Sequence, residues 1–529
     1  MSPFDWSLPY PSRRQPVLAR NVVATSQPLA TQAGLSMLAR GGNAVDAAIA
    51  TAITLTVVEP VSNGIGSDLY AFVWDGRELV GLNASGRSPA AADPSRHAGR
   101  DAMPQRGWEA VTIPGAVSGW VALSRRYGRL PFADLFEPAI RYARDGWIVS
   151  PVIAAQWRRA AGVIPHEFGW AEHFLPHGRT PNPGEAFACP PMARTLASIA
   201  ASGGESFYRG ELAATMAVHA QSYGARHTTE DFARHASDWV SPLSLEYRGA
   251  TVHQIPPNGQ GIAALQALGI LREFDMRSDS PDSLPAQHRA IEAMKLAFAD
   301  AYAHVADREH MRVSPEALLD RAYLASRARL IDMKRAQDFG PGEPPRGGTV
   351  YLATGDADGT MVSLIQSNYM GFGSGVVVPG TGISLQNRGA GFSLEPDHPN
   401  VLAGGKRPFQ TIIPGFVTRG GAPLAAFGVM GGPIQPQGHV QTLVRMLDHG
   451  MNAQAALDAP RWRWNREGTL DLEPSFDREV RAGLAALGHN LVQTSDSYFD
   501  FGAGQFVVKL DDGYLAASDP RRDGQAGGF

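Results

Sequence analysis

The apolar positions in the first part of the chain have helical spacing. The segment 44–58 is rich in alanine and apolar on nearly all sides, and it follows Asn43, which is a favourable capping residue. Residues 285–305 place large apolar side chains at helical spacing after Ser283, a second possible cap. The pattern therefore predicts a buried helix over 44–58 and a packed surface helix over 285–305.

The spacing becomes alternating after a segment that is rich in proline and glycine. That segment, residues 337–348, predicts an exposed and flexible loop, because its prolines remove backbone donors and its glycines add conformational freedom. Residues 349–367 and 505–518 each predict two antiparallel strands joined at an Asp-Gly turn. We therefore expect a stacked antiparallel sheet covered by the earlier helices, with Thr349 at the first position of a strand.

Composition narrows the class of protein. The chain has 529 residues, of which 44% are hydrophobic and 19% charged, which is typical of a globular protein with a large core. A net charge of −4 and the lack of a basic run argue against nucleic acid as a partner. The single cysteine, Cys189, excludes an internal disulfide and a cysteine-based metal cluster. Because no apolar run suits a secretion signal or a membrane span, we expect a cytoplasmic protein with no membrane partner.

Thr349 is the first candidate catalytic residue. If its hydroxyl attacked the Gly348 carbonyl, the peptide would become an ester, and hydrolysis of that ester would free Thr349 as a new N-terminus. Its α-amine, with a pKa of about 7.7–8.0, could then accept the hydroxyl proton during nucleophilic attack. An ordinary β-branched strand residue fits the same local pattern, so spacing alone leaves both interpretations open.

Long motifs carry a resemblance to the γ-glutamyltransferase family of N-terminal-nucleophile hydrolases. They are residues 22–66, IPGAVSGW at 113–120 and YRGATVHQIPPNGQGIAALQALGIL at 247–271. The resemblance runs from Asn21 to the C-terminus. It implies an α+β fold, a four-layer αββα sandwich with two stacked antiparallel sheets. It also implies a precursor that cuts itself between Gly348 and Thr349. The products would be a large subunit, 1–348, and a small subunit, 349–529, which together form one fold and could pair as a dimer of heterodimers.

The same resemblance assigns the reacting groups. Thr349 takes the place of the nucleophile, and Ser367 takes the place of a second hydroxyl that hydrogen-bonds to it. Gly431 and Gly432 match the paired glycines whose backbone N–H groups would stabilise a tetrahedral oxyanion. This chemistry needs no cofactor and no metal.

The substrate-binding positions depart from the family pattern. They fall here at Ser85, Tyr369, Asn387, Arg388, Gly391, Gln410 and Thr411, and Arg87 lies two residues after the first of them. The family has an aspartate for the substrate ammonium where this chain has Gly391, and a glutamine where it has Arg388. Losing an acid and gaining a guanidinium favours a plain carboxylate, which Arg388, or Arg87 as a second candidate, could hold through two hydrogen bonds.

Three functions follow as hypotheses. The leading one is a self-processing amidohydrolase that releases ammonia from a small acidic amide such as oxamate. The resemblance connects that reaction with purine-nitrogen breakdown. The second is a γ-glutamyl hydrolase or transferase acting on glutathione-like compounds. The third is a non-catalytic relative that binds or assembles. For Arg388 an ion pair that merely braces the pocket wall is the structural alternative.

Overall fold

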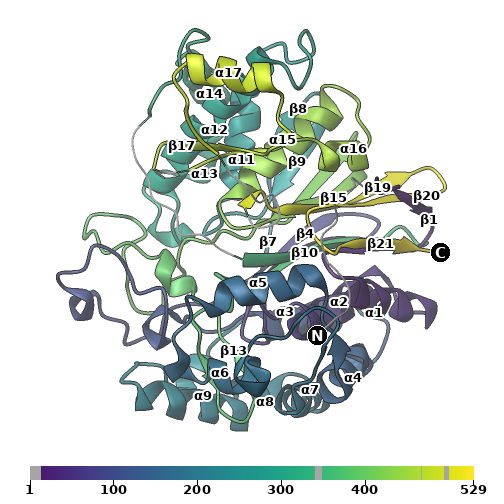
Figure 1. Cartoon of the computed structure of the whole chain (residues 1–529), viewed down its shortest axis with the longest axis vertical. Helices are drawn as coiled ribbons and strands as arrows, with labels where there is room; N and C mark the ends of the chain where they lie inside the picture. Colours follow the sequence, from purple (N-terminus) through teal and green to yellow (C-terminus); the bar gives the residue numbers. More distant parts are fainter. Residues whose placement is uncertain (1–12, 340–347, 466, 494–499) are drawn as a thin grey trace.

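Two seven-stranded antiparallel sheets stack face to face between two layers of helices (Figure 1). The computed structural model describes residues 13–339, 348–465, 467–493 and 500–529. This arrangement confirms the αββα sandwich expected from the sequence. A cluster of buried apolar side chains, among them Tyr351, Phe416 and Val507, lies between the sheets and holds them together.

One sheet has the strand order β1-β20-β19-β15-β14-β9-β8. Its strands are β1 (Val17–Ala19), β8 (Leu243–Tyr247), β9 (Ala250–Gln254), β14 (Gly415–Arg419), β15 (Ala422–Met430), β19 (Ala503–Leu510) and β20 (Gly513–Ser518). The predicted hairpin over 505–518 is confirmed, because β19 and β20 pair antiparallel about the Asp512-Gly513 turn.

The other sheet has the order β21-β2-β10-β11-β3-β4-β7. Its strands are β2 (Val22–Thr25), β3 (Asp68–Trp74), β4 (Leu79–Ala84), β7 (Asp238–Val240), β10 (Gly348–Gly355), β11 (Met361–Tyr369) and β21 (Gln525–Gly528). The hairpin predicted over 349–367 is also confirmed. Since β10 pairs with β2 and β11 pairs with β3, the hairpin of β10 and β11 lies between strands from the earlier part of the chain.

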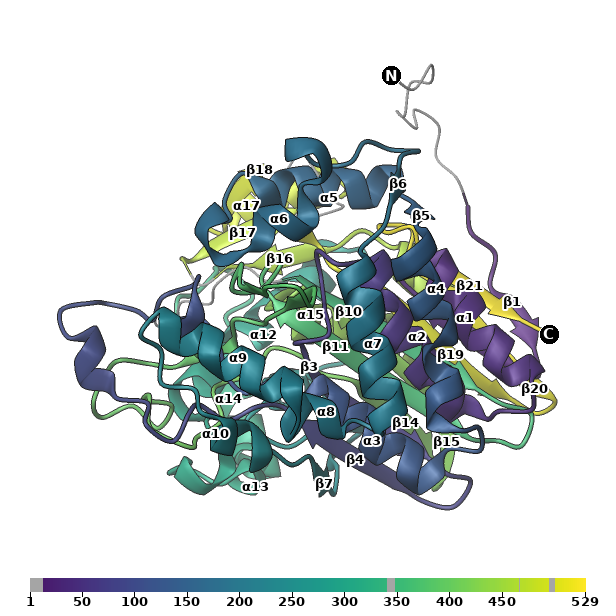
Figure 2. The ribbon, with the colours of Figure 1, turned by 90° about the horizontal axis from the view of Figure 1, so that it is seen from below.

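The helices of the first half pack on the sheet that contains β10 (Figures 1 and 2). They and their neighbours are α1 (Pro28–Ala39), α2 (Ala44–Val58), α3 (Ala116–Tyr127), α4 (Glu137–Asp145), α5 (Pro151–Ala161), α6 (Trp170–Phe174), α7 (Pro190–Ser202), α8 (Glu205–Tyr208), α9 (Glu211–Ser222) and α10 (Thr229–Ala233). Helix α2 starts at a capping box formed by Asn43 and Asp46, and every one of its residues is buried, as predicted.

A second helical layer covers the sheet that contains β15. It comprises α11 (Gly261–Leu271), α12 (Leu284–His304), α13 (Pro315–Leu318), α14 (Arg321–Ala328), α15 (Ile434–Leu447), α16 (Ala453–Asp458) and α17 (Arg478–Ala486). The expected helix over 285–305 is α12, capped by Ser283 as predicted. It is more deeply buried than a surface helix, because its polar residues Glu292, Lys295 and Asp300 are also covered.

Short elements complete the described chain. The small sheets contain β5 (Trp147–Ile148), β6 (Ala186–Phe187), β12 (Val377–Val378), β13 (Ile383–Ser384), β16 (Trp462–Trp464), β17 (Thr469–Leu472) and β18 (Asn490–Gln493). The 3₁₀ turns are η1 (Pro94–His97), η2 (Trp108–Ala110), η3 (Phe132–Phe136), η4 (His166–Phe168), η5 (Pro176–Gly178), η6 (Arg308–His310) and η7 (Arg388–Gly391). Most of the loop predicted over 337–348 lies outside the described residues, and its last residue belongs to β10.

Candidate active site

Thr349 is the second residue of β10, at an irregularity in the ladder. The register between β10 and β11 shifts between Gly348 and Val350, so Thr349 lies at a bulge, a feature that re-aims a side chain. Its Oγ1 lies 3.0 Å from Ser367 Oγ, and both side chains are buried. Ser367 Oγ also accepts the backbone N–H of Tyr369 at 2.8 Å. The structure thus brings together the two hydroxyls that the sequence comparison paired.

Gly431 and Gly432 form the turn between β15 and α15. Their φ angles are 123° and 72°, which favour glycine at both positions. The Gly432 carbonyl accepts hydrogen bonds from Gln435 N and from Gln260 Nε2. Neither glycine N–H has an acceptor among the described residues. Two unused amides at the start of a helix form a suitable anion site.

A closed ring of contacts joins the nucleophile candidate to the glycine turn and to Arg388. In order, the contacts are Thr349 Oγ1 to Ser367 Oγ (3.0 Å), Ser367 Oγ to Tyr369 N (2.8 Å), the Tyr369 ring to Arg388 (4.6 Å), Arg388 Nη1 to Thr411 Oγ1 (2.6 Å), Thr411 O to Gln260 Nε2 (2.7 Å), Gln260 Nε2 to Gly432 O (2.9 Å), Gly432 O to Gln435 N (3.1 Å) and Gln435 Nε2 to Thr349 Oγ1 (3.5 Å). Residues far apart in sequence therefore meet in one site.

Arg388 is a buried cation with unused donors. Its side chain is 1% exposed, and its Nε and Nη2 atoms have no hydrogen-bond partner among the described residues. Burial lowers the pKa of Arg388 to about 10, and the nearby Asp68 carboxylate opposes that shift. The guanidinium therefore remains charged at neutral pH. A charged donor pair without an acceptor is suited to an anionic ligand.

Asp68 is an acid of this site that the sequence analysis did not identify. It lies opposite Ser367 in the β3–β11 ladder. Its oxygens accept the backbone N–H groups of Gly86 and Gly115 and the side-chain amide of Gln410. Burial raises the pKa of Asp68 to about 6, and Arg388 partly offsets this. The site is therefore less cationic than expected, because Asp68 balances the charge of Arg388. The pairing of β3 with β11 is what places the Asp68 carboxylate in this site.

Arg87 and Asn387 have other partners. Arg87 Nη1 donates to Asp307 Oδ2 and to Gly405 O, and its side chain is 41% exposed. Asn387 Nδ2 donates to Gln105 O, and its Oδ1 accepts Met370 N. Asn387 thus anchors the segment that carries Arg388, whereas Arg87 contacts none of the ring residues in the described part of the chain.

The position of Gly391 has no room for a side chain. A Cβ atom there would lie 2.7 Å from the carbonyl oxygen of Phe409. Since that oxygen belongs to the backbone, an aspartate could not be accommodated without a shift of the chain. The backbone around position 391 therefore fits the glycine of this chain and not the aspartate of the family pattern.

A group of potential metal ligands lies elsewhere, where α12 meets the residue before β18. Potential ligand atoms of His288, Glu292 and His489 lie within 4.8 Å of one another. Lys295 Nζ, however, is 2.7 Å from Glu292 Oε1 and 3.4 Å from His489 Nδ1, and it donates to Gln337 O at 3.1 Å. An ammonium already supplies the positive charge there, so the group anchors Gln337 ahead of residues 340–347.

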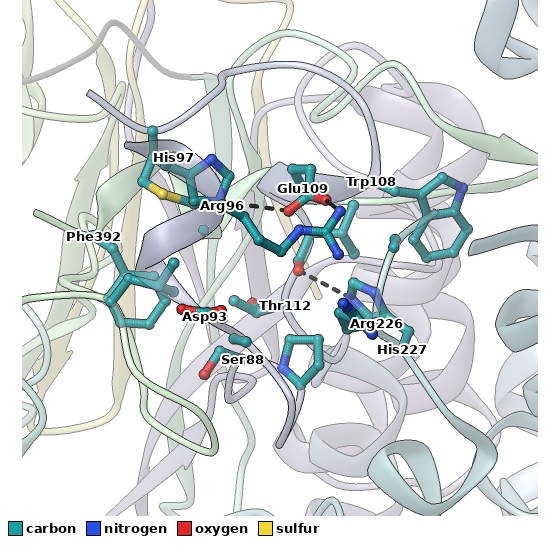
Figure 3. Close-up of a pocket in the computed structure, with 17 residues that line it drawn as sticks. Ser88, Asp93, Arg96, His97, Trp108, Glu109, Thr112, Arg226, His227 and Phe392 are labelled. Atoms are coloured by element: carbon teal, nitrogen blue, oxygen red, sulfur yellow. Dashed lines mark hydrogen bonds and ion pairs between the residues drawn. The ribbon is translucent and has the colours of Figure 1, made fainter. Parts of the chain in front are cut away.

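A small pocket lies beside the segment that carries Arg388 (Figure 3). Gly389 and Thr112 line it, and Thr112 accepts the side-chain amide of Gln386. The ion pair between Arg96 and Glu109 spans the pocket (Figure 3). The pocket has a volume of about 30 Å³, which suits one or two water molecules rather than a substrate.

Fold and site together define an αββα protein with a buried threonine at a strand start, which Gln435 connects to a glycine turn. Over residues 30–529 the chain matches the family described as Gamma-glutamyltranspeptidase, and it belongs to that family. The resemblance inferred from the sequence motifs is thereby confirmed. None of the described helices is both long and apolar enough to cross a lipid bilayer.

Similar proteins cover nearly the whole chain. The "Glutathione hydrolase-like YwrD proenzyme" of Bacillus subtilis is 38% identical over 96% of this chain and 98% of its own. The "Oxamate amidohydrolase proenzyme" of Klebsiella pneumoniae is 37% identical over 95% of this chain and 97% of its own. A cephalosporin acylase from Bacillus halodurans superimposes with a TM-score of 0.95 at 47% identity, covering 100% of this chain and 99% of that one.

Proposed function

We propose that the protein is a self-processing N-terminal-threonine amidohydrolase that acts on the linear amide of a small carboxylate. The observation that carries this proposal is the ring of contacts that joins Thr349 to the glycine turn and to the unused donors of Arg388. The family membership and the proenzyme names of the relatives support it.

Maturation would begin in the uncut chain. Thr349 Oγ attacks the Gly348 carbonyl carbon, the C–N bond to Thr349 breaks, and the nitrogen takes a proton to become the α-amine. Water then hydrolyses the Gly348 ester. The products are chains of 348 and 181 residues. Because β10 and β11 lie between β2 and β3 in one sheet, the two chains would remain associated after cleavage.

Turnover would reuse the same hydroxyl. Thr349 Oγ attacks the substrate amide carbon, and its proton passes to the Thr349 α-amine, which has a pKa of about 7.7–8.0 in model compounds. The N–H groups of Gly431 and Gly432 stabilise the oxyanion. The C–N bond breaks as the α-ammonium protonates the leaving nitrogen, and water hydrolyses the ester to release the acid.

Arg388 would select the substrate class. Its Nε and Nη2 can donate two parallel hydrogen bonds to a carboxylate, a geometry in which arginine is favoured over lysine. Thr411 and Tyr369 hold the guanidinium from the other sides. An amide next to a carboxylate, such as oxamate, places the carbonyl carbon and the anion close together, and one relative is named for that reaction.

A γ-glutamyl substrate is the second candidate. Asp68 supplies a buried carboxylate, and one relative is named glutathione hydrolase-like. Against this candidate, both Asp68 oxygens already accept protein N–H groups. The backbone at Phe409 also excludes an aspartate at position 391.

The test is a substrate panel with a nucleophile variant. Purified protein is offered oxamate, glutamine, glutathione and a γ-glutamyl anilide, and ammonia or anilide release is measured. We expect ammonia from oxamate and no turnover by Thr349→Ala. Anilide release with oxamate inert would favour the γ-glutamyl candidate. An uncut, inactive wild-type chain would favour a non-catalytic relative.

A further inference from the structure

Gln435 is a buried side chain in direct contact with the nucleophile candidate. It is the second residue of α15, and it is fully buried. Its Nε2 lies 3.5 Å from Thr349 Oγ1, and its backbone N–H donates to Gly432 O. The residue therefore links the threonine to the glycine turn in a single step.

The orientation of the Gln435 amide is fixed by a neighbour on the opposite side. Its Oε1 accepts the backbone N–H of Ile413 at 3.1 Å. Since an N–H can be paired only with an acceptor, the oxygen must face Ile413, and the NH₂ group must face Thr349. A donor is thus held toward the reacting atoms by the backbone itself.

We propose that Gln435 Nε2 is a third donor to the oxyanion, acting together with the N–H groups of Gly431 and Gly432. This inference rests on the proposed function. When Thr349 Oγ bonds to the amide carbon, the carbonyl π pair moves to its oxygen, and the hydroxyl proton passes to the α-amine. The new oxyanion is one bond from that carbon, beside the atom that Nε2 already approaches. A contact of 3.5 Å in the resting site can shorten as negative charge develops.

The variants separate donation from packing. Gln435→Glu keeps the acceptor for Ile413 N and the size of the side chain, but it replaces the donor with an oxygen. Gln435→Met removes both functions at similar volume. The control is Gln437→Glu, the same change on the same helix, where the side chain pairs with the backbone of Pro433 and Trp464 and not with Thr349.

The readout is kcat and KM on mature protein, with oxamate and with a γ-glutamyl anilide, alongside the melting temperature. Removing one oxyanion donor typically lowers kcat by about 10²–10³-fold, so we expect that loss for Gln435→Glu, with KM within about threefold. Gln435→Met should lose a similar factor. Gln437→Glu should lower the melting temperature and leave kcat of the mature protein within about threefold.

Two results would overturn the assignment. One is a Gln435→Glu variant that retains the kcat of an active wild type. The other is an equal loss of kcat in Gln435→Glu and Gln437→Glu, which would indicate a packing effect. Either result leaves the proposed function intact. A wild type that is inert on both substrates would instead overturn the proposed function, and this inference with it.

Discussion

Replacement of Arg388 by methionine distinguishes a binding residue from a structural brace. Methionine has similar length and no charge, so Arg388→Met removes the guanidinium from a site that is almost completely buried. If the guanidinium binds a substrate carboxylate, its removal should weaken substrate binding strongly with little effect on the stability of the fold. If it braces the pocket wall, the fold should suffer first.

The structure sets the expected change in stability. Burial lowers the pKa of Arg388 from 12.5 to about 10, and at about 1.4 kcal/mol per pKa unit the buried cation costs about 3 kcal/mol in the empty site. Its loss also removes the hydrogen bond to Thr411, which contributes about 1 kcal/mol. Asp68, left without its countercharge, can take up a proton at a cost of about 1 kcal/mol near neutral pH. The free energy of unfolding should therefore change little or rise slightly.

The expected change in activity is large. Truncating one partner of a buried, hydrogen-bonded charge pair costs about 2–5 kcal/mol of binding, so kcat/KM for oxamate should fall by about 30-fold to 5,000-fold. Denaturant unfolding and steady-state kinetics on the same preparation measure both quantities. The same substitution at Arg87, which pairs with Asp307, should leave kcat/KM within about threefold. A loss of more than about 3 kcal/mol of stability with kcat/KM retained would refute the reasoning and make Arg388 a brace.

Three further predictions follow from buried charges. The kcat of the mature protein should rise with pH through about 7.7–8.0, where an α-amine loses its proton. Because the Asp68 carboxylate offsets the charge of Arg388 and has a pKa raised to about 6, its protonation below pH 6 should lower KM for oxamate, and Asp68→Asn should remove that change in KM. Burial raises the pKa of Glu59 from 4.5 to about 7, so the folded chain binds an extra proton and loses stability as pH rises between those values. Glu59→Gln should therefore stabilise the fold by up to about 3 kcal/mol at pH 8 and hardly at pH 4. Equal effects at both pH values in denaturant melts would contradict this. Lys295→Met should leave the buried Glu292 carboxylate without its ion-pair partner and lower the free energy of unfolding by about 3–5 kcal/mol. It should also expose the segment at Gln337 to limited proteolysis. Adding Glu292→Gln to Lys295→Met should recover part of the lost stability.

Local patterns in the sequence predicted much of the fold. Asn43 and Asp46 form the capping box that begins α2, and the Asp-Gly turns join the two expected hairpins, because caps and tight turns depend on neighbouring residues. Helix α12 was expected at the surface, and it is buried because segments distant in sequence cover its polar face.

The candidate site could be predicted only in part, for a similar reason. Family motifs located Thr349 and the glycine turn, which the structure brings together. Asp68 and Gln435 match no motif used in the sequence analysis. Asp68 reaches the site through the pairing of β3 with β11, and Gln435 reaches it because α15 packs on β15 with its first turn beside Thr349. Because the aligned positions do not include Asp68, the charge predicted from them for this site is too positive.

Intact mass of the purified protein, with the N-terminal residue of each chain, tests the central claim most directly. The account predicts two chains of 348 and 181 residues, the smaller beginning at Thr349, in a preparation that releases ammonia from oxamate. Thr349→Ala should give one chain of 56.5 kDa with no activity. An uncut wild-type chain that still turns over substrate would contradict the account, because Thr349 would then have no free α-amine to accept the proton.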